Sequence, residues 1–324
     1  MFRIAQVALT LALATAGLAY SGQAHAVDGL EWKWEEGQTR RFVSRVEMEL
    51  PEPVMFNAEV NQDAFLSALN LAVVMACTPE ANLKKRGWEI RCVLEDVAIA
   101  GRPIPNSVGR IQPIAQEWSD KLKNGGELLI IHGRDGTIRQ VALEGVDKRL
   151  RRMQNIQEIM RQVLTRAVAP LDLQLPKKGD TRGSDSWQQR NALPMHYLSP
   201  VGTMGGMKVE HKISTQDGDT LVVHQSGSGT VGGAQMGAND QPRNLFAVNM
   251  TGTSTFDRAA GHFTDVQYLV RGLPTASGTR GEGGGDVEYR QATKFRLLDG
   301  DEKPTLFEPA EIGGAQQGGS NVLK

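Results

Sequence analysis

Residues 127–144 read ELLIIHGRDGTIRQVALE, and this stretch decides the fold class. Two runs rich in apolar residues flank Arg134-Asp135-Gly136-Thr137. Asp-Gly is the dipeptide whose left-handed backbone fits a tight turn between twisted strands. The stretch therefore predicts a β-hairpin, with one strand over 127–132 and its partner over 138–143.

Two more hairpins are predicted further along the chain. One runs over 207–215, turns at Asp217-Gly218 and returns over 221–225. The other joins 245–257 to 262–270 through a turn at 258–261. Strand signals at this density indicate antiparallel sheet.

The segment 41–50 shows the alternation of a strand with one buried face. The residues predicted to face the core are Phe42, Ser44, Val46, Met48 and Leu50. Those predicted on the other face are Val43, Arg45, Glu47 and Glu49. Such a period of two is typical of a half-buried strand.

Two helices are predicted between the strands. The shorter covers 113–123 and stops at Asn124-Gly125. The longer runs from about Val146 to Val168 and ends before Pro170, with apolar residues at helical spacing. We therefore expect a mainly β (α+β) fold of curved antiparallel sheets, with one long amphipathic helix packed across a sheet.

The polar face of the longer helix is basic, which leaves two interpretations. A basic amphipathic helix can bind a membrane surface or an acidic partner. Alternatively, its arginine stems extend to water while the apolar stripe packs on the sheet. The second interpretation is favoured because the segment carries no bulky aromatic anchor.

The N-terminal residues 1–26 have the parts of a secretory signal peptide. Arg3 precedes an apolar stretch over 4–19, and Ala24-His25-Ala26 supplies the small residues of a cleavage site. A retained membrane anchor is the weaker interpretation because polar residues interrupt the apolar stretch. We expect cleavage after Ala26, a mature protein without a transmembrane segment, and a periplasmic or secreted location.

The remaining chain is predicted to form two packed lobes and a tail. The N-terminal sheet-plus-helix lobe covers 27–176, the C-terminal antiparallel β lobe covers 177–312, and a disordered tail covers 313–324. The glycine-rich stretches 226–233 and 277–285 are predicted as loops between strands. The chain has 36 basic and 37 acidic residues, a balance that argues against a nucleic-acid partner.

The chain has two cysteines, Cys77 and Cys92, and each adjoins a strand-like run. The turn region 78–87 separates the two runs. A disulfide across this hairpin agrees with export, because such bonds persist in oxidising compartments. A redox or metal role would need a CxxC motif or a histidine cluster nearby, and the sequence has neither there.

His211 and His224 are the candidate metal ligands. With a two-residue turn at Asp217-Gly218, the two histidines would stand directly opposite on neighbouring strands. Two imidazoles so placed can supply half of a zinc or copper site, or form a pH-sensitive pair. The alternative is a neutral cross-strand pair, and a change of one residue in register would separate them.

Tryptophans and the long helix supply the candidate ligand-binding residues. Trp32 and Trp34 fall on one strand face and could line a lipid or glycan groove, although core packing is the competing interpretation. A groove between sheet and helix would be lined by Met153, Ile156 and Met160.

The order of elements resembles a family of bacterial envelope proteins. Behind an export signal come strands, a long helix and more strands, with Gly183-Ser184-Asp185-Ser186-Trp187 after the helix and a turn at 256–261. This order resembles that of LolA-type lipoprotein-carrier half-barrels and of related exported proteins of unknown function. The resemblance implies an apolar cavity between sheet and helix and no particular functional residue.

Catalytic motifs are not found in the sequence. It has no GxSxG elbow, no HExxH and no EF-hand loop, so we expect no cofactor and no enzymatic site of those kinds. The favoured function is binding of an apolar ligand or lipid in a sheet–helix groove. The alternatives are a structural or assembly partner of another envelope protein and, third, a hydrolase without a recognisable motif.

Overall fold

The computed structural model describes residues 30–58, 62–103, 111–146, 161, 163–176, 185–190, 203–233, 245–274 and 289–306. The signal peptide predicted over 1–26 and the tail predicted over 313–324 lie outside these ranges. The described strands are β1 (Arg40–Ala58), β2 (Gln62–Asn82), β3 (Trp88–Pro103), β4 (Glu127–His132), β5 (Ile138–Glu144), β6 (Ser186–Arg190), β7 (Thr203–Asp217), β8 (Thr220–Gly233), β9 (Leu245–Asp257), β10 (His262–Pro274) and β11 (Tyr289–Leu297).

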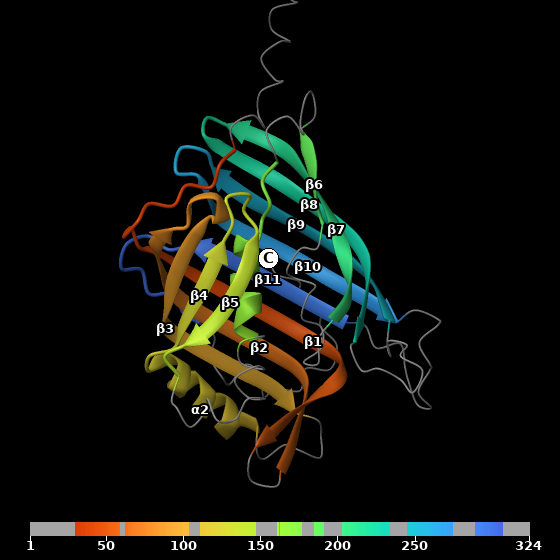
Figure 1. Cartoon of the computed structure of the whole chain (residues 1–324). Helices are drawn as coiled ribbons and strands as arrows, with labels where there is room; N and C mark the ends of the chain where they lie inside the picture. The colour runs from red at the N-terminus through yellow and green to blue at the C-terminus, as the bar shows by residue number, and fades with distance from the viewer. Residues whose placement is uncertain are drawn as a thin grey trace, which may run out of the picture.

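All eleven strands belong to one antiparallel sheet, in the order β5-β4-β3-β2-β1-β11-β10-β9-β8-β7-β6. Strands consecutive in the chain pair with each other in two runs, and pairing of β1 with β11 joins the runs. One sheet therefore runs through both predicted lobes. Figure 1 shows its strong curvature, with β4 and β5 crossing in front of β11. The mainly β, antiparallel prediction is confirmed.

The three predicted hairpins occur as β4–β5, β7–β8 and β9–β10. Gly136 and Gly218 have φ of 83° and 56°, values that glycine adopts without the clash of a Cβ. The alternation predicted for β1 is also present, since Phe42, Val46 and Met48 are buried while Arg45 is exposed. Local turn chemistry and local periodicity were thus sufficient for these elements.

The prediction that residues 226–233 form a loop is wrong, because they belong to β8. Glycine is a weak strand former, but close packing favours it here. A Cβ at Gly227 would lie 3.1 Å from Met207 Sδ and 3.1 Å from Val209 Cγ2 on β7. The missing side chain makes room for two apolar neighbours. The second predicted loop, 277–285, lies outside the described residues.

The shorter helix is confirmed as α2 (Ile111–Lys123), which buries Trp118 and Leu122. Of the segment predicted as the longer helix, the structure describes little more than the two ends. Residues 163–168 are helical and lead into the 3₁₀ turn η3 (Ala169–Leu171), whereas Val146 has no helical conformation. Residues 147–160 lie outside the described ranges.

The main core is one cluster, which draws on both ends of the sheet. It includes Val141 from β5, Trp187 from β6 and Leu164 from the helical residues 163–168. A smaller cluster of Val43, Val74 and Leu298 lies on the other face of the sheet. The alternating positions of β1 contribute to both, with Phe42 in the main core and Val43 in the smaller cluster.

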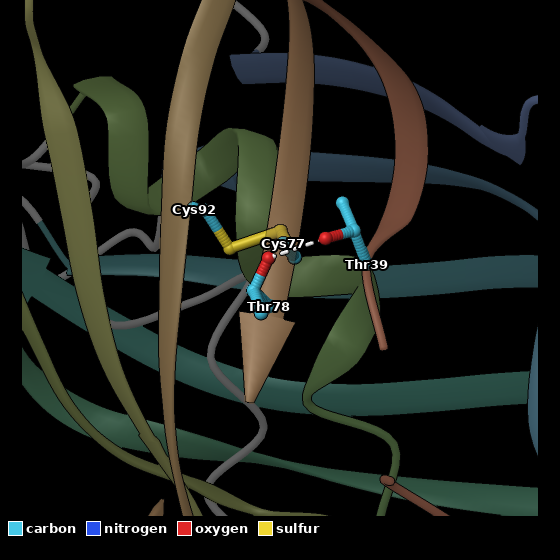
Figure 2. The surroundings of a disulfide bond; sticks show 4 residues. All are labelled: Thr39, Cys77, Thr78 and Cys92. Atoms are coloured by element: carbon cyan, nitrogen blue, oxygen red, sulfur yellow. Dashed lines mark hydrogen bonds between the residues drawn. A yellow bond between two sulfur atoms is a disulfide. The ribbon is translucent and has the colours of Figure 1, made fainter. Parts of the chain in front are cut away.

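Cys77 and Cys92 are direct partners on β2 and β3, and their sulfurs are 2.09 Å apart (Figure 2). Both residues are fully buried, as expected for a structural bridge. Thr78 follows Cys77, and its hydroxyl oxygen lies 2.7 Å from the hydroxyl oxygen of Thr39. This hydrogen bond joins the residue before β1 to β2.

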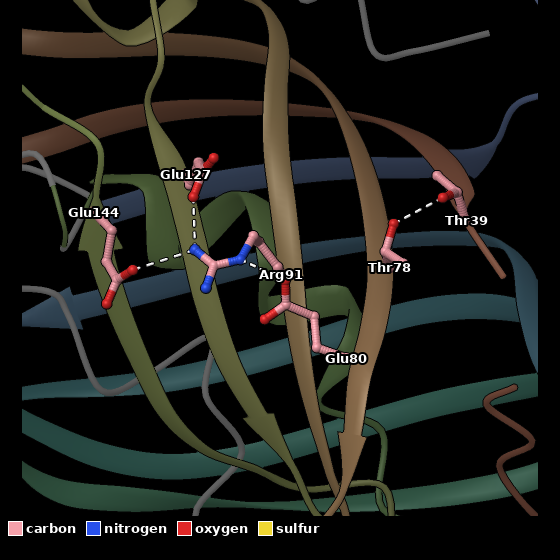
Figure 3. Close-up of polar contacts among 6 residues, drawn as sticks. All are labelled: Thr39, Thr78, Glu80, Arg91, Glu127 and Glu144. Carbon is pink, nitrogen blue, oxygen red and sulfur yellow. Dashed lines mark hydrogen bonds and ion pairs between the residues drawn. The ribbon is translucent and has the colours of Figure 1, made fainter. Parts of the chain in front are cut away.

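The neighbouring residue Arg91 projects from the opposite face of β3 and ties adjacent strands together. Its guanidinium lies 2.6 Å from Glu80 on β2, 2.6 Å from Glu127 on β4 and 3.2 Å from Glu144 on β5 (Figure 3). These three carboxylates raise the pKa of Arg91 above its ordinary value. One cation thus links four consecutive strands.

Candidate ligand-binding site

The segment Leu171–Leu175 lies between the two edge strands of the sheet, β5 and β6. On the β5 side, the backbone N–H of Ile138 donates to Asp172 Oδ1 at 2.6 Å. On the β6 side, Gln189 Nε2 donates to the backbone oxygen of Asp172 at 2.9 Å. We call Leu171–Leu175 the seam segment, because it bridges edges that would otherwise present unpaired backbone groups.

Buried side chains fix the carbonyl groups of the seam segment. Trp32 Nε1 donates to the Leu173 oxygen at 3.1 Å, and His132 Nε2 lies 3.0 Å from the Leu171 oxygen. Burial lowers the pKa of His132 to about 4, so its imidazole is neutral at neutral pH. The ring therefore donates through Nε2 and leaves Nδ1 as the acceptor for Trp34 Nε1, which is 3.4 Å away.

Trp32 and Trp34 belong to this core. They are 5% and 4% exposed, and their rings stack with centroids 6.1 Å apart. This placement agrees with core packing, the competing interpretation of the tryptophans. The other three predicted ligand contacts, Met153, Ile156 and Met160, lie outside the described residues.

A row of buried polar side chains crosses the sheet beside the seam segment. The strand registers place Thr293 of β11 opposite Tyr268 of β10, and Gln225 of β8 opposite His211 of β7. Gly252 of β9 stands between Tyr268 and Gln225. We call Thr293, Tyr268, Gln225 and His211 the polar stripe. All four side chains are at most 5% exposed.

Apolar residues border the polar stripe, because neighbouring positions on the same face are two residues away along each strand. Val266 and Val270 flank Tyr268, and Val209 lies next to His211 on β7; all three are buried. A buried apolar face that carries a few aligned polar groups is the usual composition of a small-molecule site. The polar stripe is the candidate functional site.

Glycine at position 252 is required where the polar stripe passes over β9. A Cβ there would lie 2.6 Å from the Gln267 oxygen and 2.7 Å from Tyr268 Cβ. Glycine thus lets Tyr268 and Gln225 approach each other across β9. A cavity with room for about one water molecule lies at this point, lined by Tyr268, Gln225, His211, Asp172 and Met250 among others.

The His211 end of the polar stripe is joined to the seam segment by hydrogen bonds. His211 Nε2 donates to Gln189 Oε1 at 3.2 Å, an assignment fixed because Gln189 Nε2 already donates to Asp172. Burial lowers the pKa of His211 to about 4, so the ring is neutral at neutral pH. This end of the polar stripe is uncharged and held in a defined tautomer.

The middle of the polar stripe carries an unused acceptor. Gln225 Nε2 donates to Ser254 Oγ at 3.3 Å, whereas Gln225 Oε1 has no hydrogen-bond partner among the described residues. The side chain is 3% exposed, and a buried unpaired acceptor costs about 1–3 kcal/mol. A hydrogen-bond donor that entered the adjacent cavity would recover this loss.

The predicted opposition of His211 and His224 is wrong. The turn residues are Gly218 and Asp219, because Asp217 pairs with Thr220, and the register then shifts by one residue between Ile213 and Thr215. His211 consequently lies opposite Gln225, and His224 lies opposite Lys212. A shift of one residue moves a side chain to the other face, so His211 is buried while His224 is exposed. The two imidazoles cannot share a metal ion in this arrangement.

Within the described ranges, no group of three histidine, cysteine, aspartate or glutamate side chains is arranged to hold a metal ion. A helix with the length and apolar character of a membrane span is likewise not found in this part of the chain.

Sequence reasoning missed Gln189, Gln225, Tyr268 and Thr293. The available signal was weak, namely polar residues at core-facing positions between apolar ones, such as Tyr268 between Val266 and Val270. Each residue alone looks like an isolated exception. Only the register across β6 to β11 brings them together.

No protein-family model matches this chain, and no curated protein sequence does. Among solved structures, DynF from the dynemicin biosynthesis pathway of Micromonospora chersina is similar over 87% of this chain and 86% of DynF, at 6% identity and a TM-score of 0.17. A similarity of that size carries no argument about fold or function. The resemblance to LolA-type half-barrels stays a prediction.

Proposed function

We propose that this chain is an exported envelope protein that binds an apolar ligand or lipid against the concave face of its sheet. The observation that carries the proposal is the polar stripe, an uncharged row of hydrogen-bonding groups set in an apolar face. Such a surface suits a ligand that is mostly apolar and has few polar atoms. No catalytic step is proposed.

The seam segment and the turn η3 (Ala169–Leu171) that leads into it would cover the bound ligand, and we call them together the covering segment. Pro170 and Leu173 line the cavity from this side, while Val209 and Met250 line it from the sheet. The cavity holds about one water molecule, so a larger ligand enters only when the covering segment moves. Side-chain hydrogen bonds and one backbone bond, from Leu175 N to the Asp135 oxygen, hold the segment, and these contacts can break without dismantling the sheet ladder.

Export is supported by the N-terminal composition and by the buried bridge between Cys77 and Cys92. The test is the mass of the protein purified from the envelope fraction of its own cells. We expect a chain that begins at Val27 and is lighter by about two hydrogens than the reduced chain. A chain that keeps residues 1–26, or one with free thiols, would overturn this part of the proposal.

Ligand binding is tested by native mass spectrometry of the same material and by titration with a fluorescent apolar probe. We expect a co-purified small molecule, and at least tenfold weaker probe binding in Met250→Phe, which fills the cavity. Leu273→Phe is the matched control, because Leu273 is 55% exposed on neighbouring β10. Circular dichroism establishes that both variants fold.

The same experiments separate the proposal from an assembly role. A protein that neither carries a ligand nor binds the probe, and that co-purifies with another envelope protein, would replace the carrier role. Equal probe binding by Met250→Phe and Leu273→Phe would show that the probe binds elsewhere, which contradicts the placement of the site.

A further inference from the structure

The cavity on the polar stripe fits one hydrogen-bond donor about the size of a water oxygen. Gln225 Oε1 is buried beside it and has no partner among the described residues. A hydroxyl group is the ligand group that matches this space and supplies one O–H donor. Tyr268, which also lines the cavity, has a phenol that can donate to the ligand oxygen.

The charges around the cavity disfavour an anionic head group. The side chains of the polar stripe carry no charge at neutral pH, and the charged residue that lines the cavity is Asp172. Its carboxylate accepts from Ile138 N at 2.6 Å and from Gln189 Nε2 at 3.3 Å. A second carboxylate in this dehydrated space would be repelled by the first.

A cationic head group would be attracted by Asp172, but it needs more acceptors than a hydroxyl group does. An ammonium has three N–H donors that all need acceptors once water is removed. Each oxygen of Asp172 already accepts one hydrogen bond, from Ile138 N and from Gln189 Nε2, so the carboxylate offers only its remaining lone pairs. Gln225 Oε1 is the amide oxygen of the cavity wall that has no hydrogen-bond partner among the described residues, and it matches the single donor of a hydroxyl group.

The rest of the cavity wall is apolar. Val209, Met250 and Val266 contribute from the sheet, and Pro170 and Leu173 contribute from the covering segment. An alkyl chain attached to the hydroxyl would contact these side chains as the covering segment moves outward. The apolar wall and the acceptor Gln225 Oε1 together fit an amphipathic molecule.

From these features we infer that the polar stripe recognises the hydroxyl group of a neutral, long-chain amphiphile, such as a fatty alcohol or a monoacylglycerol. The inference rests on the proposed function. It adds the chemical class of the ligand and names Gln225 as the residue that discriminates for it.

The test compares ligands that share one alkyl chain. The mature protein is titrated with 1-dodecanol, dodecyl methyl ether, dodecanoate and dodecylamine in competition with the fluorescent apolar probe. The ether keeps the chain and the oxygen but lacks the O–H donor. We expect 1-dodecanol to bind at least tenfold more tightly than the ether and than either charged ligand.

Variants assign the preference to Gln225. Gln225→Leu should lower the ratio of the 1-dodecanol affinity to the ether affinity to about one. Gln225→Met provides an unbranched replacement should the leucine variant fail to fold. Gln267→Leu is the matched control, because Gln267 is exposed on β10, and it should keep the wild-type ratio.

Two outcomes overturn the inference while leaving the proposed function in place. One is equal binding of alcohol and ether by the wild type, which is the result expected if the cavity holds only water. The other is tighter binding of dodecanoate or dodecylamine. Failure of all four compounds and of the probe to bind would instead overturn the proposed function itself.

Discussion

Trp187 stacks on His211, with ring centroids 5.1 Å apart and ring planes inclined by 14°. The indole N–H of Trp187 donates to the Gln174 oxygen at 2.7 Å, so this pair also anchors the seam segment. His211 therefore belongs at once to the polar stripe, to the core and to the contact between β6 and the seam segment. Its protonation state affects all three.

Acid should destabilise the protein through its buried histidines. Burial lowers the pKa of both His132 and His211 to about 4, against an ordinary value of 6.5. The unfolded chain therefore binds more protons between these pH values, so the free energy of unfolding falls as the pH falls from about 6.5 to about 4. The loss reaches about 3 kcal/mol for each histidine.

Urea unfolding between pH 4 and pH 8 measures this dependence. His211→Gln should flatten the slope below pH 6.5, because it removes one of the two buried imidazoles whose pKa is lowered. A wild-type unfolding free energy that stays constant from pH 7 to pH 4.5 would contradict a neutral, buried His211.

Substitution of Gly252 by alanine should destabilise the sheet. The new Cβ would clash with the Gln267 backbone oxygen at 2.6 Å, and backbone atoms cannot move aside as a side chain can. We expect Gly252→Ala to lower the free energy of unfolding by about 2 kcal/mol. Gly227→Ala should cost less, because its nearest neighbours at 3.1 Å are side-chain atoms of Met207 and Val209.

Both variants replace a strand glycine by alanine, so the strand propensity changes equally in the two. The difference between their free energies of unfolding therefore reports the clash at position 252. Chemical denaturation of both proteins supplies the comparison. Equal stabilities of the two variants would mean that β9 and β10 can separate at Gly252, which is incompatible with the register observed there.

Much of the local structure could be predicted from the sequence. The hairpin marked by Asp217-Gly218, the alternation in β1 and the end of α2 at Lys123 depend on neighbouring residues, so their signals are local. The pairing of β1 with β11 is different. Val46 and Thr293 are partners in this pairing although most of the chain lies between them in sequence. No local periodicity predicts which distant strand β1 pairs with.

The candidate site was hidden from sequence reasoning for the same reason. Counting across a two-residue turn at Asp217-Gly218 paired His211 with His224, but the turn residues are Gly218 and Asp219, and the register shifts again near Ser214. The polar stripe depends on this corrected register and on three further strand pairings. An error of one residue in any of them would move a side chain to the other face of the sheet.

Loss of the Asp172 carboxylate should loosen the seam segment. In Asp172→Ala, the Ile138 N–H loses its acceptor at 2.6 Å and Gln189 Nε2 loses its contact at 3.3 Å. We expect about 1–3 kcal/mol less stability and faster hydrogen exchange over 171–175. Asp172→Asn keeps an acceptor for Ile138 and should recover part of the loss. Unchanged exchange in the alanine variant would show that the segment is held by its backbone alone.

The bridge between Cys77 and Cys92 should resist reductants as long as the protein is folded. Both residues are fully buried, and thiol–disulfide exchange requires that a sulfur be accessible to the attacking thiolate. Reduction by dithiothreitol should therefore be slow in native buffer and fast in urea, as thiol labelling with mass detection can follow. Because the bridge closes a loop over a sequence separation of 15, its removal in the Cys77→Ala/Cys92→Ala variant should cost about 3 kcal/mol. Rapid labelling of both cysteines in native buffer would mean that β2 and β3 open locally, and the bridge would then be placed in a mobile part of the sheet.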